Sequence, residues 1–169
     1  WFCPDGEPSY SSTVDTNRCE YSIFIRPGYH MGLSYTHGGF LKGVIWIRPF
    51  GSSEREPVVI QTPLRTNQWY HVGMSVDEIN QEMILYVNGK EVGKQQYEGE
   101  LIKYLNKPYY IGVGDPTTTQ WRNFYEGQIA EIGLWPDTLK DYELELIFNK
   151  GIVNNKGEYT ISKLPVGVW

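Results

Sequence analysis

The stretch Gln68-Trp69-Tyr70-His71-Val72 decides the fold together with two later ones, Leu85-Tyr86-Val87-Asn88-Gly89-Lys90 and Tyr110-Ile111-Gly112-Val113-Gly114. From Tyr70 to Val76, apolar side chains alternate with small or polar ones, which predicts a strand with one buried face. Asn88-Gly89 stands between two strand-like runs, residues 83–87 and 90–92. This pair predicts a tight hairpin, because a type I′ turn needs positive φ at both central residues.

The rest of the chain also favours an all-β protein. It contains 18 Gly and 10 Pro, and 6 Trp, 13 Tyr and 6 Phe, while its apolar residues recur with period two. Earlier strands are predicted at residues 20–26, 32–36, 42–49 and 57–62, each bounded by Gly, Pro or Ser.

One short helix is predicted near the carboxyl end. One helical face would carry Leu139, Leu144, Ile147 and Phe148. The first turn holds Asp141 and Glu143, which suit a helix N-terminus, and Gly151 is a plausible end. We expect this to be the only helix and the tail, residues 152–169, to return as an edge strand.

These motifs, with Phe124-Tyr125-Glu126-Gly127-Gln128-Ile129-Ala130-Glu131-Ile132-Gly133-Leu134-Trp135 and Asn149-Lys150-Gly151, resemble a laminin-G-like domain of the concanavalin-A-like lectin/glucanase superfamily. The resemblance is clearest over residues 68–151 and looser over 20–62. It implies a single domain over residues 1–169, folded as a two-sheet antiparallel β-sandwich, or jelly roll. It also assigns Trp69 and Trp135 to the scaffold. Such scaffold motifs do not determine the ligand.

Charge and length exclude several classes of partner. The 169 residues carry a net charge of −5, and Lys and Arg are scattered singly. We therefore expect neither nucleic acid nor an anionic membrane surface as a partner. The apolar runs are too short to span a bilayer, so no membrane insertion is expected.

The amino-terminal segment suggests an extracellular setting. The chain begins at Trp1 without an initiator methionine, so we expect a fragment processed or excised from a larger protein. Cys3 and Cys19 enclose fifteen mostly polar residues. A disulfide between them would contribute about 3 kcal/mol and imply an oxidising compartment. The alternative is two unrelated buried thiols.

Catalysis is not expected. Retaining glycosidases need two carboxylates about 5 Å apart, which one strand face can supply. The acidic alternation of Asp141, Glu143 and Glu145 falls in the predicted helix, and Glu131 is alone on its strand. Two carboxylates converging in a cleft would instead favour a catalytic function. The three histidines, His30, His37 and His71, lack a metal-binding spacing.

The first candidate binding surface is the polar loop at residues 115–125. Sugar rings stack on aromatic side chains, while their hydroxyls pair with amide, carboxylate and guanidinium groups. Trp121 is the proposed stacking platform, with an alternative role of capping the end of the sandwich. Its proposed polar and aromatic neighbours are Asp115, Gln120, Arg122, Asn123 and Tyr125. Tyr125 could instead pack inside.

A second candidate surface lies on the early strands. Tyr35 and His37 are two residues apart and would share a face, as would Trp46 and Arg48. An indole beside a guanidinium suits a sugar, but Trp46 would be core if its face pointed inward. The alternative for Tyr35 and His37 is an ordinary outer strand face.

Calcium is expected only from the resemblance, since domains of this superfamily often hold a structural ion at the sandwich edge. The oxygen ligands available here would be Asp5, Asp15, Asp115 and Glu131, whose spacing forms no recognisable loop.

The sequence thus predicts a noncatalytic carbohydrate-binding module on a cell surface, a virion or another extracellular protein, with a glycan or polysaccharide as its partner. The alternative is a protein-interaction or structural domain that contacts other domains or subunits. A groove with interleaved polar groups would favour sugar, whereas a flat apolar patch would favour protein.

Overall fold

The computed structural model describes residues 1–8, 20–26, 31–103, 108–113, 124–135 and 137–150. Eleven strands and one helix lie in this part of the chain. In order they are β1 (Phe2–Pro4), β2 (Glu20–Arg26), β3 (Met31–Thr36), β4 (Phe40–Pro49), β5 (Glu56–Pro63), β6 (Val72–Asp77), β7 (Glu82–Val87), β8 (Lys90–Gln96), β9 (Gly99–Leu101), β10 (Tyr110–Ile111), β11 (Gly127–Ile129) and α1 (Asp141–Lys150).

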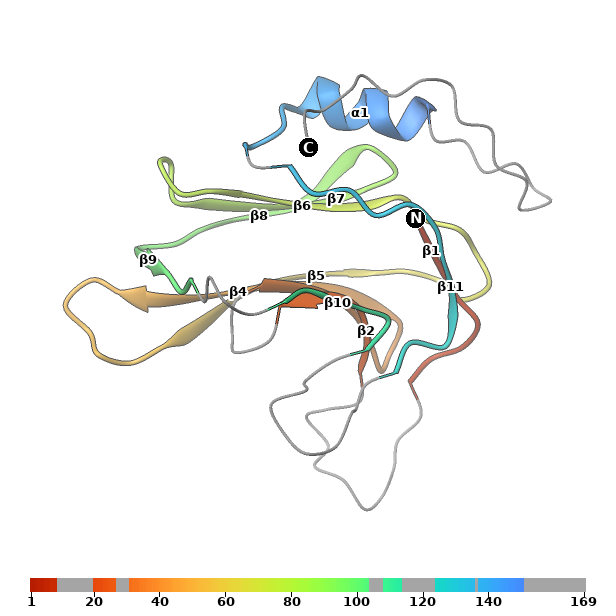
Figure 1. Cartoon of the computed structure of the whole chain (residues 1–169), viewed down its shortest axis with the longest axis horizontal. Helices are drawn as coiled ribbons and strands as arrows, with labels where there is room; N and C mark the ends of the chain where they lie inside the picture. Colours follow the sequence, from red (N-terminus) through yellow and green to blue (C-terminus); the bar gives the residue numbers. More distant parts are fainter. Residues whose placement is uncertain (9–19, 27–30, 104–107, 114–123, 136, 151–169) are drawn as a thin grey trace, which may run out of the picture.

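Two antiparallel sheets are stacked face to face (Figure 1). The larger has the order β10-β2-β3-β4-β5, and β9 also pairs with β4. The smaller has the order β6-β7-β8, and α1 lies over its outer face. A short β1–β11 pair stands beside the two layers. The predicted all-β sandwich of the jelly-roll type, with one short helix in the described chain, is confirmed.

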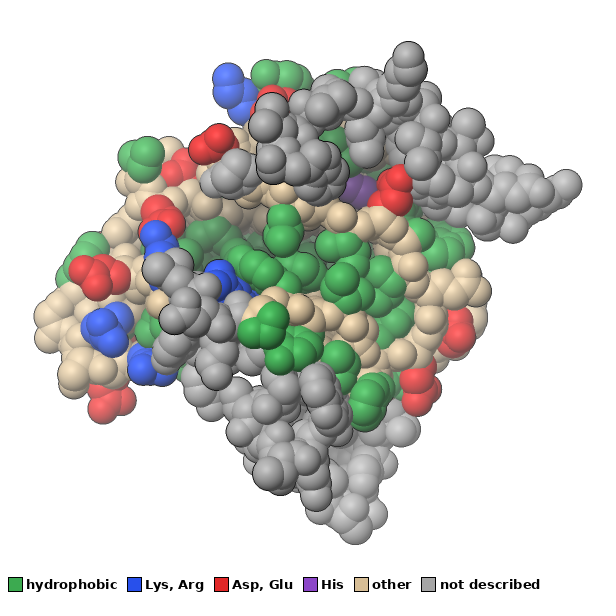
Figure 2. All heavy atoms as spheres, viewed as in Figure 1, with side chains coloured by type: hydrophobic (Ala, Val, Ile, Leu, Met, Phe, Trp, Pro, Cys, Tyr) green, Lys and Arg blue, Asp and Glu red, His purple; other side chains and the backbone are tan. Residues whose placement is uncertain are grey.

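The core fills the space between the sheets. Along β4, Leu41, Ile45 and Ile47 point inward and are buried, and Met83 and Leu85 face them from β7. This is the alternation expected of a strand with one face on the core. Figure 2 shows hydrophobic side chains gathered between the layers and acidic ones around the rim.

The strands predicted at 20–26, 32–36, 42–49 and 57–62 are present as β2 to β5, with some ends shifted by one or two residues. The hairpin is also confirmed, because Asn88 and Gly89 have φ of 52° and 75° and join β7 to β8. A register shift between Leu85 and Tyr86 adds a bulge, and β8 continues to Gln96.

Helix α1 occupies the predicted position. The backbone N–H of Lys140 donates to the Glu143 carboxylate (2.8 Å), as in a capping box. The Tyr86 hydroxyl donates to Asp141 (2.9 Å), which ties the start of the helix to β7. Leu144 is buried, so the predicted apolar face does pack on the sheet.

Two strand predictions were too long. β6 begins at Val72, because Tyr70 instead bridges Phe2 of β1. β11 ends at Ile129, and Glu131 is not in a strand, since its φ of 49° is left-handed. Trp135, assigned to the scaffold, is 46% exposed and lies over Gly133. In the described residues, no helix is long and apolar enough to cross a membrane.

Candidate functional site

The first predicted surface lies mostly outside the described part of the chain. Its platform and polar partners lie outside the described residues, namely Trp121, Asp115, Gln120, Arg122 and Asn123. Their binding role therefore stays a prediction.

Tyr125, the last residue of that predicted surface, packs against the core. Its ring meets Phe2 edge-on, with centroids 6.2 Å apart, and Tyr21 in the same way at 6.1 Å. Burial raises the pKa of its hydroxyl, and that hydroxyl donates to the Gln128 carbonyl (3.4 Å). The structure thus supports the packing alternative.

The prediction for Tyr35 was wrong. Its side chain is completely buried, and its hydroxyl donates to the Leu64 carbonyl (3.3 Å). In the sheet it pairs with Leu41, another core residue, so its face is the inner one. His37 lies beyond the end of β3 and is exposed, with Nδ1 3.1 Å from the Pro8 carbonyl oxygen. The two side chains form no common surface.

Trp46 and Arg48 do point away from the core, since they alternate with the buried Ile45 and Ile47. Trp46 is half-buried and Arg48 is exposed. Across the ladders, Trp46 pairs with Pro57 of β5, while Arg48 pairs with Glu100 of β9. Trp46 is therefore not core, and the predicted indole and guanidinium share the outer face of the larger sheet.

A polar cluster on this outer face was missed. The Lys42 ammonium contacts the Glu20 carboxylate (2.9 Å), which also accepts from the Ser34 hydroxyl (3.2 Å). Ser22, the register partner of Ser34, is buried, and its hydroxyl has no hydrogen-bond partner among the described residues. The alternation of Glu20 and Ser22 with apolar residues was the available sequence signal.

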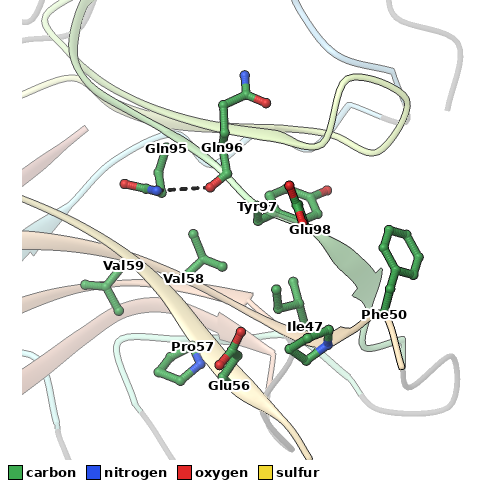
Figure 3. A pocket seen from close by; sticks show the side chains of 11 residues that line it. Ile47, Phe50, Glu56, Pro57, Val58, Val59, Gln95, Gln96, Tyr97 and Glu98 are labelled. Atoms are coloured by element: carbon green, nitrogen blue, oxygen red, sulfur yellow. Dashed lines mark hydrogen bonds between the residues drawn. The ribbon is translucent and has the colours of Figure 1, made fainter. Parts of the chain in front are cut away.

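A groove runs along the sandwich edge between β5 and β8, the outermost strands of the two sheets (Figure 3). The strands touch where Gly93 lies against Ile60, a contact that leaves no room for a Cβ. Beyond this point a hollow of about 460 Å³ opens, which we call the edge groove. Its lining residues are Ile47, Pro49, Phe50, Glu56, Pro57, Val58, Val59, Gln95, Gln96, Tyr97 and Glu98.

Aromatic and polar groups are interleaved in the edge groove. Phe50, in the turn after β4, is 65% exposed at one end of the groove. Tyr97 is buried, with its hydroxyl donating to the Asp77 carbonyl (3.3 Å). Gln95 donates from its side-chain amide to the Gln96 carbonyl (3.0 Å), so the oxygen of that amide is still available as an acceptor. The groove offers an apolar floor and a rim of amides and carboxylates.

Two carboxylates line this groove, Glu56 from β5 and Glu98, which follows β8. Figure 3 shows them on opposite walls, and both residues are exposed to solvent. A glycosidase acid is usually shielded in an apolar site. Glu56 and Glu98 lack that shielding and are better suited to accepting hydrogen bonds from a bound molecule.

The metal and disulfide predictions both involve residues outside the described part of the chain. Within the described residues, no group of three or more His, Cys, Asp or Glu is placed to hold a metal ion. Of the expected calcium ligands, Asp15 and Asp115 lie outside those residues, so calcium stays an expectation. Cys3 has a free thiol whose pKa is raised by burial. The bridge to Cys19, itself outside the described part, is not shown and stays a prediction.

Comparison with known families agrees with this architecture. The model of the concanavalin A-like lectin/glucanases superfamily matches residues 1–145. The chain belongs to this superfamily. No curated protein matches it.

Two solved structures are similar to this superfamily member. One is named a "putative carbohydrate binding protein" from Bacteroides ovatus, with 19% identity and a TM-score of 0.59. The match covers 85% of this chain but 38% of that one. The other is an S-layer domain-containing protein from Clostridium thermocellum, with 18% identity, a TM-score of 0.42 and coverage of 83% and 67%. At these identities the first similarity shows the fold alone.

Proposed function

We propose that this domain is a noncatalytic carbohydrate-binding module and that its ligand lies in the edge groove. One observation carries the proposal: the groove interleaves aromatic side chains, Phe50 and Tyr97, with the amide of Gln95 and the carboxylates of Glu56 and Glu98. Its volume, about 460 Å³, lies in the range of small-molecule sites.

These groups suit the surface of a sugar. The exposed ring of Phe50 can stack on the apolar C–H face of a pyranose. Carboxylates and amides accept hydrogen bonds from hydroxyl groups. The similar protein from Bacteroides ovatus, whose printed name refers to carbohydrate binding, supports the same class of ligand.

The module would act as an attachment domain of a larger extracellular, cell-surface or virion protein. The superfamily match supports this location. The loop with Trp121 and the outer face with Trp46 and Arg48 would then be further places where a long glycan makes contact.

A second candidate function is protein–protein contact. Ile132, Leu134 and Trp135 are 40%, 55% and 46% exposed, three apolar side chains within four residues. Exposed apolar groups that gather in this way are typical of interaction surfaces. A neighbouring domain or subunit would be the partner.

The test is a glycan-array screen of the purified domain, with and without calcium. Wild type is compared with Phe50→Ala at the groove, Trp121→Ala in the loop, and Ile79→Ala as the control. Ile79 is 93% exposed at the β6–β7 turn and does not line the groove. We expect specific binding that weakens about three- to tenfold in Phe50→Ala alone.

The other outcomes are equally informative. Binding lost only in Trp121→Ala moves the site to the loop. No binding by folded protein leaves the protein-contact function. Release of shorter sugars from a bound glycan contradicts the noncatalytic proposal.

A further inference from the structure

A second hollow adjoins the edge groove. It has a volume of about 380 Å³ and is lined by Phe50, Glu78, Gln81, Tyr97, Gly99, Glu100, Leu101 and Lys103. Phe50 and Tyr97 line both hollows, so these two rings stand at the junction. The two hollows therefore meet at these rings, and we call them together the track.

The backbone at the junction is held by close contacts of Gly99. Gly99 begins β9 with a φ of 156°, and it approaches the Arg48 carbonyl so closely that no Cβ fits there. The Gln81 amide donates to the Gly99 carbonyl (3.2 Å), which fixes the turn from β8 into β9. The close approach of Gly99 therefore lets β9 pair with β4 shortly after Tyr97.

The charge along the track is negative. Glu56 and Glu98 line the first hollow, and Glu78 and Glu100 line the second. Among the described lining residues, Lys103 is the only base, and its ammonium is 2.6 Å from the Glu78 carboxylate. In the first hollow an anionic ligand would meet Glu56 and Glu98, and the described lining residues there include no Lys or Arg to receive it. In the second, Lys103 is already paired with Glu78.

We propose that the two hollows together bind several consecutive units of a neutral oligosaccharide, with Phe50 stacked on a unit at the junction. This inference rests on the proposed carbohydrate-binding function and narrows it to a class of ligand. Carboxylates accept hydrogen bonds from neutral sugar hydroxyls, whereas uronic, sialic and sulfated sugars are repelled. A ligand confined to one hollow would leave the other half of the track unused.

Titration calorimetry with sugars of matched length tests the inference. The probes are neutral gluco- and manno-oligosaccharides of two to six units and oligogalacturonides as their anionic counterparts. We expect affinity for the best neutral series to rise at least tenfold from two units to six. The anionic series should bind at least tenfold more weakly, and added salt should reduce this difference.

Variants locate the effect. In the Glu56→Gln/Glu98→Gln double variant, the ratio of the affinity for neutral sugars to that for anionic sugars should fall at least threefold. Glu54 lies in the nearby exposed turn and lines neither hollow. Glu54→Gln removes one charge there and should leave this ratio of affinities unchanged. Phe50→Ala should weaken the six-unit neutral sugar more than the two-unit one.

The failures are distinguishable. If no sugar binds to folded protein in calorimetry or on the array, the proposed function itself fails. If anionic sugars bind as tightly as neutral ones, or affinity does not depend on length, this inference is overturned while carbohydrate binding stands. The inference is also overturned if the double variant and Glu54→Gln change the ratio of neutral to anionic affinity by the same factor.

Discussion

Acid should destabilise this domain through one buried histidine. His71 is 8% exposed and packs between the rings of Trp1 and Phe148, at centroid distances of 5.3 Å and 5.9 Å. Its Nδ1 is buried and has no hydrogen-bond partner within the described part of the chain. Burial lowers the pKa of His71 from 6.5 to about 4, because a charged imidazole would lose its water there.

The sign of the effect follows from proton binding. In the unfolded chain the histidine takes up a proton near pH 6.5, whereas the folded protein holds it neutral down to about pH 4. The unfolded state therefore binds more protons between these values, and the free energy of unfolding falls as the pH drops through this window. The separation of the two pKa values corresponds to about 3 kcal/mol, all of it lost below pH 4.

Urea unfolding followed by tryptophan fluorescence, at intervals from pH 7.5 to 4, measures this loss. In His71→Phe an apolar ring that cannot take up a proton replaces the imidazole. The hydrogen bonds of the residue 71 backbone with Asn88 (3.0 and 2.7 Å) are retained. We expect the free energy of unfolding of this variant to lose most of its pH dependence above pH 5. His37→Gln, which changes an exposed histidine, should keep it.

The reasoning would be refuted by equal pH dependence in wild type and His71→Phe. An NMR titration of the wild-type imidazole protons checks the same point without any substitution. A midpoint of His71 near 6.5 in the folded protein would contradict the burial argument.

Three further predictions concern the scaffold, each measured by thermal or urea unfolding. Gly89→Ala should cost about 1–2 kcal/mol, since φ is 75° and the new Cβ would lie 3.1 Å from Phe148; Gly51→Ala, with φ of 79° and open space, should cost less. Equal losses would mean that contact with the helix is unimportant. Tyr86→Phe should cost about 1 kcal/mol by removing the bond to Asp141, and an unchanged midpoint would contradict that role. Leu85→Ala should cost about 3 kcal/mol because Leu85 is fully buried, whereas Leu146→Ala, at an exposed position, should cost under about 1. Similar losses at the two leucines would refute the assigned core.

Much of the fold could be predicted because its signals are local. The alternation of β4 and the Asn88-Gly89 turn are set by neighbouring residues, so the sequence alone identifies them. Alternation reports which residues share a face, but not which face is buried. For this reason the sequence wrongly predicted Tyr35 on a binding surface, although its side chain is buried. For the same reason it left open whether the face of Trp46 and Arg48 points inward or outward.

The edge groove has no comparable local signal. Its walls come from β5 and β8, which lie in different sheets and meet only because Gly93 lets them touch at Ile60. The sequence shows a polar run at Gln95-Gln96 but cannot show that Phe50, more than forty positions earlier, stands at the end of the same hollow. Sites made by the divergence of two sheets depend on long-range packing.

The position of the groove gives its polar rim a second role. Within the described chain, β5 and β8 each pair on one side only, so their outer edges carry unpaired backbone N–H and C=O groups. Such edges invite another strand to add to the sheet, and proteins discourage this with charges and proline. Glu56 and Pro57 lie at the start of β5, and Glu98 follows β8. These residues disfavour an added strand, yet they leave the hollow open to a ligand that brings hydroxyl groups in place of a polypeptide backbone. The same carboxylates would thus help to keep the domain from pairing with itself and to select a sugar without negative charge.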